Sequence, residues 1–305
     1  MPELLAGWLA TYENPASRKT LSRHVAPLIA GRDLATITPG EVVAWATGGA
    51  QRIANNSVRS RIAAVRSFWA WAERHGVAVQ SIEVEAERLR KAYPRLFGGA
   101  ETKYPNRRLE RDEVGRLLSS CRDGSWQGSR NQLIVRLGIH GLRLSDITGL
   151  TWGMREADGS WSWRGKQNRL RVLVPGPALA ECLRRWERAY SAGLGRTVGG
   201  DDAVIVSVKG GKRVLWGTPL GGEAVRVTVQ RLAQRAGLGH LTTHDLRRTC
   251  AHLLHEARTP DGGRQFGLVE IQRALGHASP VVTERSYLAP MARADLAISS
   301  AVLDM

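Results

Sequence analysis

Cysteine is scarce in this chain, and the metal-binding patterns that depend on it are missing. The 305 residues include three cysteines, Cys121, Cys182 and Cys250, which lie far apart in the sequence. There is no CxxC pair and no group of His and Cys residues at the spacing of zinc ligands. Neither a disulfide framework nor a structural metal site is therefore expected.

Long apolar runs are lacking as well. No uncharged stretch reaches the length of a membrane-spanning helix. The first residues, MPELLAGWLATYEN, contain Glu3 and lack the basic start of a secretory signal peptide. We therefore expect a soluble, cytoplasmic protein with no membrane partner.

Acidic residues are few relative to basic ones. The chain has 28 Asp and Glu against 44 Lys and Arg, a formal net charge of +16 and a sequence pI near 10.8. The basic residues are scattered along the sequence, and 43% of all residues are apolar, which is enough to build folded cores. This composition argues against a disordered basic tail and favours a folded protein with a polyanionic partner, most simply a nucleic acid.

The length and the pattern of apolar residues predict two domains. Residues 1–95 form a helical unit on this prediction, with a capping box at Thr38 and Glu41 and the longest helix near 57–75. A proline and a glycine pair then indicate a linker at 96–106. The second domain is expected to occupy residues 107–305 and to end in a further helix.

The long helix of the first domain has an apolar face and a basic face. Its arginines Arg59, Arg61 and Arg66 are predicted to face outward. They are either contacts to a nucleic-acid backbone or an ordinary solvated face.

The second domain is predicted to be mostly helical with a small amount of β structure. Helical periodicity covers the segments 109–118, 131–140, 176–190 and 220–238. AVIVSV at 203–208 is expected to be a short strand. The stretch WSWRGKQNRLRVLVP alternates on both sides of a turn, which predicts an antiparallel hairpin with Lys166 near its tip.

Basic residues crowd this hairpin and the loop after the predicted strand. Arg169 and Arg171 in the hairpin are interpreted as phosphate contacts. In the loop KGGKR, Lys209, Lys212 and Arg213 either hold a DNA backbone or form a plain solvated loop.

The segment from Thr243 to Tyr287 carries the residues best suited to chemistry. Thr243 is expected to cap a helix on which His244 and Arg247, three residues apart, project together. A second helix, 268–275, is predicted to end at Gly276, and His277 follows at once.

Upstream, GLRLSD places Arg143 at the start of another helix, three residues before Asp146. Asp146 either orients Arg143 or is simply an acid at a helix N-terminus. Arginine forks bind phosphate oxygens in bidentate fashion, so two arginines in one pocket indicate a phosphate substrate. Two such groups stabilise the negative charge of a pentacoordinate phosphorus without a metal.

Taken in order, these motifs resemble those of the tyrosine recombinase, or phage integrase, family. The resemblance rests on Arg143 in GLRLSD, Lys166 in RGKQNRLRVLVP, HDLR at 244–247, LGH at 275–277 and Tyr287. It covers about the last two hundred residues, and the N-terminal hundred are more loosely similar to the family's core-binding domain. The implied fold is mainly α, with a helical, SAM-like core-binding domain and a mostly helical catalytic domain that contains a small antiparallel sheet.

The resemblance also implies the chemistry. Tyr287 would attack a DNA phosphate to give a 3′-phosphotyrosyl intermediate, with Arg143 and Arg247 stabilising the charge. His244 would accept the phenolic proton, His277 would hydrogen-bond a non-bridging oxygen and Lys166 would protonate the leaving 5′ oxygen. Neither ATP nor a metal cofactor is required for this strand exchange.

The partners that the family implies are duplex DNA with a specific recombination site, a homo-tetramer on that DNA and an accessory DNA-bending or directionality factor. The final helix would dock on a neighbouring protomer. A two-domain, Xer-like recombinase and a compact integrase of a phage or mobile element both fit, in either case bacterial or phage-encoded and associated with the nucleoid. The ten residues from His277 to Tyr287 exceed the family's more usual nine.

Two other functions are compatible with the same residues. A type IB topoisomerase uses a similar pocket but relaxes supercoils without a defined site. A non-catalytic DNA-binding regulator derived from a recombinase would form no covalent adduct.

Overall fold

The computed structural model describes residues 2–48, 55–80, 107–165, 169–208 and 217–276. The chain divides into two compact units, residues 1–103 and 104–305. The linker expected at 96–106 and the final helix expected near the C-terminus lie outside the described residues.

The first unit is helical and closes around its own apolar core. Its helices are α1 (Pro2–Ala10), α2 (Pro15–Ile29), the 3-10 turn η1 (Leu34–Thr36), α3 (Pro39–Thr47) and α4 (Asn55–Arg74). Thr38 and Glu41 form the predicted capping box at the start of α3. On α4 the apolar face is buried, with Val65 and Phe68 fully inaccessible to solvent.

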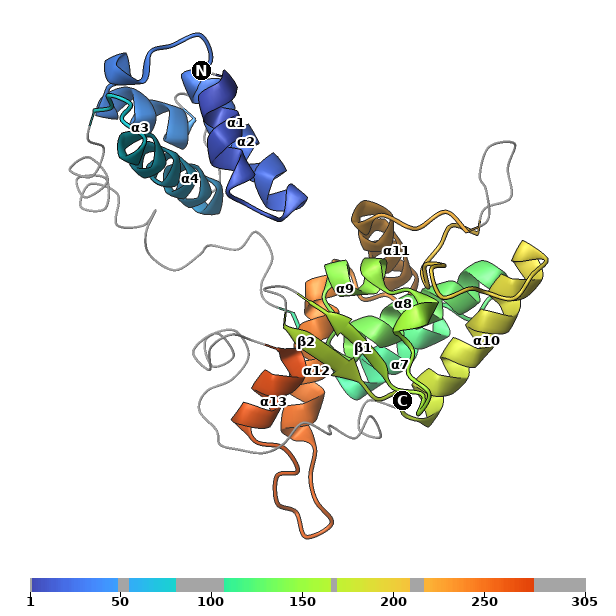
Figure 1. Ribbon diagram of the computed structural model, residues 1–305. Helices are drawn as coiled ribbons and strands as arrows, with labels where there is room; N and C mark the ends of the chain where they lie inside the picture. Colours follow the sequence, from blue (N-terminus) through green and yellow to red (C-terminus); the bar gives the residue numbers. More distant parts are fainter. Residues whose placement is uncertain (1, 49–54, 81–106, 166–168, 209–216, 277–305) are drawn as a thin grey trace. The chain divides into compact units, whose positions relative to one another are not determined.

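The second unit is mostly helical with one small sheet. Its elements are α7 (Arg111–Ser119), α8 (Trp126–Ile139), α9 (Leu144–Gly149), η2 (Trp152–Met154), β1 (Trp161–Arg164), β2 (Leu170–Leu173), α10 (Pro177–Leu194), α11 (Gly222–Arg235), α12 (Thr243–Glu256) and α13 (Leu268–Leu275). Together with the first unit this confirms the predicted fold class, mainly α with a small antiparallel sheet (Figure 1).

Helix α8 is the centre of the second unit. Every residue from Arg130 to Ile139 is buried, and α7, α9, α10, α11 and α12 all pack against this helix. Ser125 caps α8 by accepting the Gly128 N–H at 2.9 Å, so the helix begins earlier than its run of apolar residues predicts. The buried helix ends at Ile139, and Gly141, just past the C-cap His140, has a left-handed φ of 84°.

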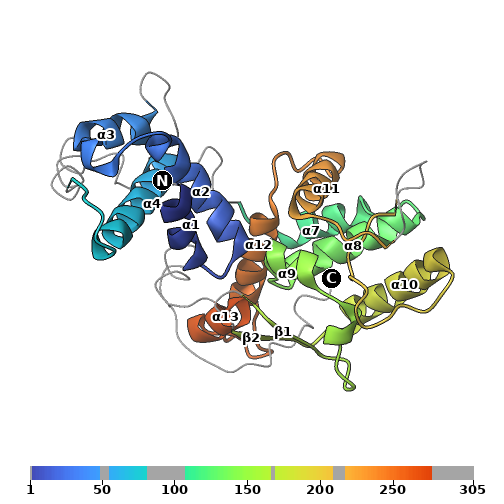
Figure 2. The same ribbon diagram turned by 45° about the horizontal axis from the view of Figure 1, so that its top comes forward.

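The predicted hairpin is present, with Trp163 opposite Arg171 and Arg164 opposite Leu170. Trp161 and Trp163 face the core, while Leu170 is exposed. The views of Figure 1 and Figure 2 agree in placing β2 beside α13.

The prediction of a strand at 203–208 is wrong. These residues form only isolated bridges, Thr151 with Ala203 and Val206 with Pro219. The apolar run is buried because it passes between the chain near Leu150 and the chain near Thr218. Within the described residues neither neighbour continues alongside it as a strand, so burial alone produces the apolar pattern.

Candidate active site

The described part of the chain contains Arg143, Asp146, His244 and Arg247 from the predicted catalytic set. Lys166, His277 and Tyr287 lie outside the described residues, as do Lys209, Lys212 and Arg213 in the predicted DNA-binding loop.

Arg143 is held at a junction between helices. It is the N-cap residue of α9, and the buried Asp146 carboxylate accepts its backbone N–H at 2.9 Å. Asp146 therefore positions Arg143 through the backbone and also serves as an acid in the first turn of α9. The Arg143 guanidinium extends to α13 and donates to the Gly276 carbonyl at 2.7 Å.

The N-terminus of α12 presents His244. Thr242, not Thr243 as predicted, is the cap: its hydroxyl accepts the Asp245 N–H, and the Asp245 carboxylate accepts the Thr242 N–H at 2.9 Å. The capping box needs an acid three residues after the cap, which Thr242 has and Thr243 lacks. His244 is therefore the second residue of the helix, with an exposed side chain.

The surroundings of His244 favour its neutral form. Partial loss of hydration lowers the pKa of this imidazole, and the positive charges of Arg248, Arg247 and Arg143 lower it further. Asp245 acts in the opposite direction. An imidazole that is neutral at physiological pH can accept a proton.

Arg247, three residues after His244 on α12, is buried, with 1% of its surface exposed. Its guanidinium donates to the carbonyls of Gly141 and Leu275, and so links the ends of α8 and α13 to α12. A buried cation that contacts two fixed carbonyls has a defined position before any substrate binds.

Arg171 joins the same group of side chains from the hairpin. Its guanidinium donates to the Ala274 carbonyl at 2.9 Å. Burial, followed by the charge of Arg143, lowers the pKa of Arg171, and the carboxylate of Asp146 opposes this shift. Its contact with phosphate stays a prediction, whereas Arg169 is exposed on the hairpin.

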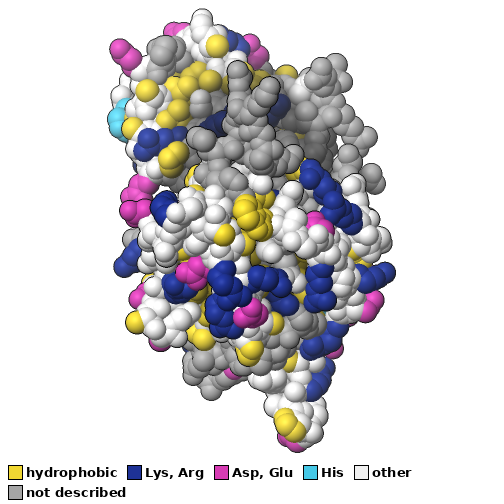
Figure 3. Space-filling model, turned by 90° about the vertical axis from the view of Figure 1, so that its right-hand side faces the viewer, with side chains coloured by type: hydrophobic (Ala, Val, Ile, Leu, Met, Phe, Trp, Pro, Cys, Tyr) yellow, Lys and Arg dark blue, Asp and Glu magenta, His cyan; other side chains and the backbone are white. Residues whose placement is uncertain are grey.

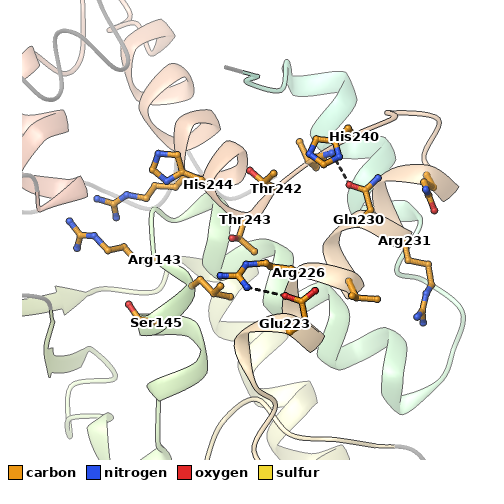
Figure 4. Close-up of a pocket in the computed structure, with 15 residues that line it drawn as sticks. Arg143, Ser145, Glu223, Arg226, Gln230, Arg231, His240, Thr242, Thr243 and His244 are labelled. Carbon is orange, nitrogen blue, oxygen red and sulfur yellow. Dashed lines mark hydrogen bonds and ion pairs between the residues drawn. The ribbon is translucent and has the colours of Figure 1, made fainter. Parts of the chain in front are cut away.

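A cavity of about 840 Å³ opens beside these residues. Arg143, His244 and Arg247 line it together with part of α11, as Figure 4 illustrates for Arg143 and His244. Glu223, an acidic residue that lines the cavity, forms an ion pair with Arg226 at 3.0 Å.

The sequence pattern predicts the apolar face of α11 but not the polar side that lines this cavity. Arg226, Gln230 and Gln234 follow one another at four-residue spacing and share the cavity wall, with Arg231 beside them. That polar stripe is the signal that could have identified this cavity wall.

On the face shown in Figure 3, Lys and Arg side chains gather with single acidic side chains between them.

The arginines of α4 are in mixed surroundings. Arg61 donates to the Trp45 carbonyl at 2.9 Å, and its guanidinium lies 5.0 Å from the centre of the Trp45 ring. Arg59 and Arg66 are half-buried. The outward orientation predicted for Arg61 is therefore incomplete, because this side chain packs against α3.

Two kinds of site are absent from the described residues. No three His, Cys, Asp or Glu side chains there are placed to hold a metal ion. None of the helices described is long and apolar enough to cross a membrane.

Solved structures define the class of the fold. The chain matches a lambda integrase dimer bound to a COC′ core site with a TM-score of 0.63 and 16% identity, covering 98% of this chain and 99% of that one. It matches XerH bound to palindromic difH, in a post-cleavage complex, with a TM-score of 0.59 and 16% identity, covering 89% and 76% of the two chains. The chain therefore has the fold of lambda integrase and XerH.

The chain belongs to the phage integrase family, whose sequence profile matches residues 107–293. It is 30% identical to the tyrosine recombinase XerC of Xylella fastidiosa over 234 residues, which cover 75% of this chain and 68% of that protein. It is 28% identical to XerC of Corynebacterium efficiens over 273 residues, 86% and 76% of the two chains. The protein is thus an enzyme of the site-specific tyrosine recombinase class, and these relatives are bacterial.

Proposed function

We propose that the cavity beside α12 receives the scissile phosphate of a DNA duplex and that Tyr287 is the nucleophile. The observation that carries this proposal is the convergence of Arg143, His244 and Arg247 on one cavity wall. His244 and Arg247 come from α12 and Arg143 comes from the start of α9, and their arrangement is suited to a tetrahedral anion.

The proposed reaction exchanges one phosphoester for another. The Tyr287 oxygen forms a bond to phosphorus as the bond to the 5′ oxygen breaks, which leaves a 3′-phosphotyrosyl link and a free 5′ hydroxyl. The phenolic proton passes to His244, and Lys166 gives a proton to the departing oxygen. Attack by a 5′ hydroxyl from another strand reverses these steps, and because the ester is conserved no ATP is consumed.

The two arginines lower the barrier by charge. The non-bridging oxygens carry more negative charge in the pentacoordinate state than in the diester, so fixed guanidinium groups stabilise the transition state more than the substrate. His277 would add a hydrogen bond to one of these oxygens. Asp146 contributes indirectly, by holding the backbone of Arg143.

We further propose that the DNA carries a specific recombination site and that four copies of the chain act on it. In support, one structural neighbour is a lambda integrase tetramer bound to a Holliday junction, matched with a TM-score of 0.64 and 17% identity over 96% of this chain. The net charge of +16 also favours a polyanionic partner. An accessory DNA-bending factor and association with the bacterial nucleoid belong to the same proposal.

The test uses a nicked suicide duplex that contains a site selected by binding from a randomised duplex library. Loss of the short cleaved fragment prevents religation, so wild-type protein is expected to accumulate an SDS-resistant protein–DNA adduct. The Tyr287→Phe variant should bind the duplex and form none.

Two results would oppose the proposal. Equal adduct from Tyr287→Phe would exclude this nucleophile, and supercoil relaxation on plasmids without the site would favour a topoisomerase.

A further inference from the structure

Three arginines from different elements bind the C-terminal end of α13. The last carbonyls of a helix have no partner within it and carry a partial negative charge. Here the carbonyl of Ala274 accepts from Arg171, that of Leu275 from Arg247 and that of Gly276 from Arg143. Each of these three successive carbonyls therefore accepts a hydrogen bond from a different guanidinium.

Gly276 makes room for this arrangement. Its φ of 60° is left-handed, and a Cβ atom at this position would overlap the Arg171 guanidinium. The glycine thus ends the helix and also lets the hairpin arginine lie directly against the backbone.

The hairpin register explains why the Arg171 side chain contacts α13. Arg171 pairs with Trp163, and directly opposite residues share one face of a sheet. That face is the buried one, since Trp163 is 7% exposed, while Leu170 and Val172 on the other face are 64% and 59% exposed. The side chain is thus directed toward α13.

We propose that Arg171 is a positioning residue for Arg143. Arg171 and Arg247 fix the end of α13, and the last carbonyl of that end, on Gly276, fixes the Arg143 guanidinium beside the cavity. Through these contacts Arg171 connects the hairpin to the catalytic arginine. This positioning role takes the place of the direct phosphate contact that the sequence predicts for Arg171. This inference rests on the proposed function.

The test compares Arg171→Met with wild type in the full-length protein on the nicked suicide duplex. Two quantities are measured: the rate of adduct formation at saturating protein, and the DNA dissociation constant as a function of salt. We expect the rate to fall about 10- to 100-fold, the scale of a small misplacement in an active site. Affinity and its salt dependence should stay unchanged.

A double-variant experiment tests whether Arg171 acts through Arg143. In an Arg143→Ala background, adding Arg171→Met should cause little further loss of rate, because the residue to be positioned is gone. Arg171→Lys, which keeps the charge and can reach one carbonyl, should recover part of the rate. Arg164→Met, on the exposed side of the same hairpin, is the matched control and should cleave like wild type.

Several results would overturn the inference. A fall of about one in the slope of log DNA affinity against log salt concentration would identify Arg171 as a phosphate contact. An unchanged rate of adduct formation, or full additivity with Arg143→Ala, would exclude a positioning role. If Arg171→Met does not fold, Arg171→Gln against Arg164→Gln decides by the same rate and slope. Absence of any adduct from wild-type protein would instead contradict the proposed function.

Discussion

Arg247 illustrates how a single side chain combines structure and chemistry. It is almost fully buried, yet it lines the cavity. Its guanidinium donates to carbonyls at the ends of two other helices. Each of these carbonyls, if buried without a partner, would destabilise the fold by about 1–3 kcal/mol. The positive charge is thus fixed in place by the fold, and the proposed binding of a phosphate would require no reorganisation of this side chain.

His244 leads to a prediction about pH. Its pKa is lowered from the ordinary 6.5, first by lost hydration and then by the nearby arginines, so the neutral base predominates at physiological pH. The rate of adduct formation should therefore be constant near neutrality and fall only as the pH drops below that ordinary value. A single-turnover pH profile measures this, and His244→Asn, which cannot take up the proton, should lack the acidic limb. A wild-type limb centred above pH 7 would contradict the assignment.

The same shift affects folding. The imidazole takes up a proton more readily in the unfolded chain, so this group reduces stability as the pH falls through the ordinary value and has no effect well above it.

At the scale of elements, the ends of helices position the site. Arg143 caps α9, His244 lies in the first turn of α12, and the end of α13 is bound by arginines. Helix ends provide backbone groups that need partners, which is why they attract charged side chains and fix their direction.

The cap of α12 gives a second prediction. Thr242→Ala should destabilise the protein by about 1 kcal/mol, because the hydroxyl that accepts the Asp245 N–H is lost. Thermal unfolding should show a fall of about 2–4 °C for a domain of this size. Thr242→Ser, which retains the hydroxyl, is the control. Unchanged unfolding in Thr242→Ala would show that another residue caps this helix.

The sequence predicted elements best where a local signal ends them. Helix α13 was predicted with its observed bounds, because an apolar periodic segment runs directly into Gly276. The predicted strand at 203–208 failed, since a short apolar run indicates burial and not pairing. The contact of Arg171 with Ala274 could not be predicted, because it depends on hairpin register and on the packing of β2 against α13.

At the scale of the whole molecule, both units are expected to contact DNA. If Arg59 and Arg66 each contact a phosphate, changing both to Gln should lower the slope of log affinity against log salt by about two. Titrations of a labelled duplex at several salt concentrations measure the slope. Arg74→Gln, at the end of the same helix, is the control. An unchanged slope in the double variant would assign these arginines to the protein's own packing.

The most direct measurement of the central claim is the identity of the residue that becomes linked to DNA. After cleavage of the suicide duplex, nuclease trimming and trypsin digestion, mass spectrometry should find a nucleotide 3′-phosphate on the peptide 286–293, SYLAPMAR, which contains Tyr287. A nucleotide on a peptide that contains Tyr104 or Tyr190, or the absence of any modified peptide from a cleaved duplex, would contradict it.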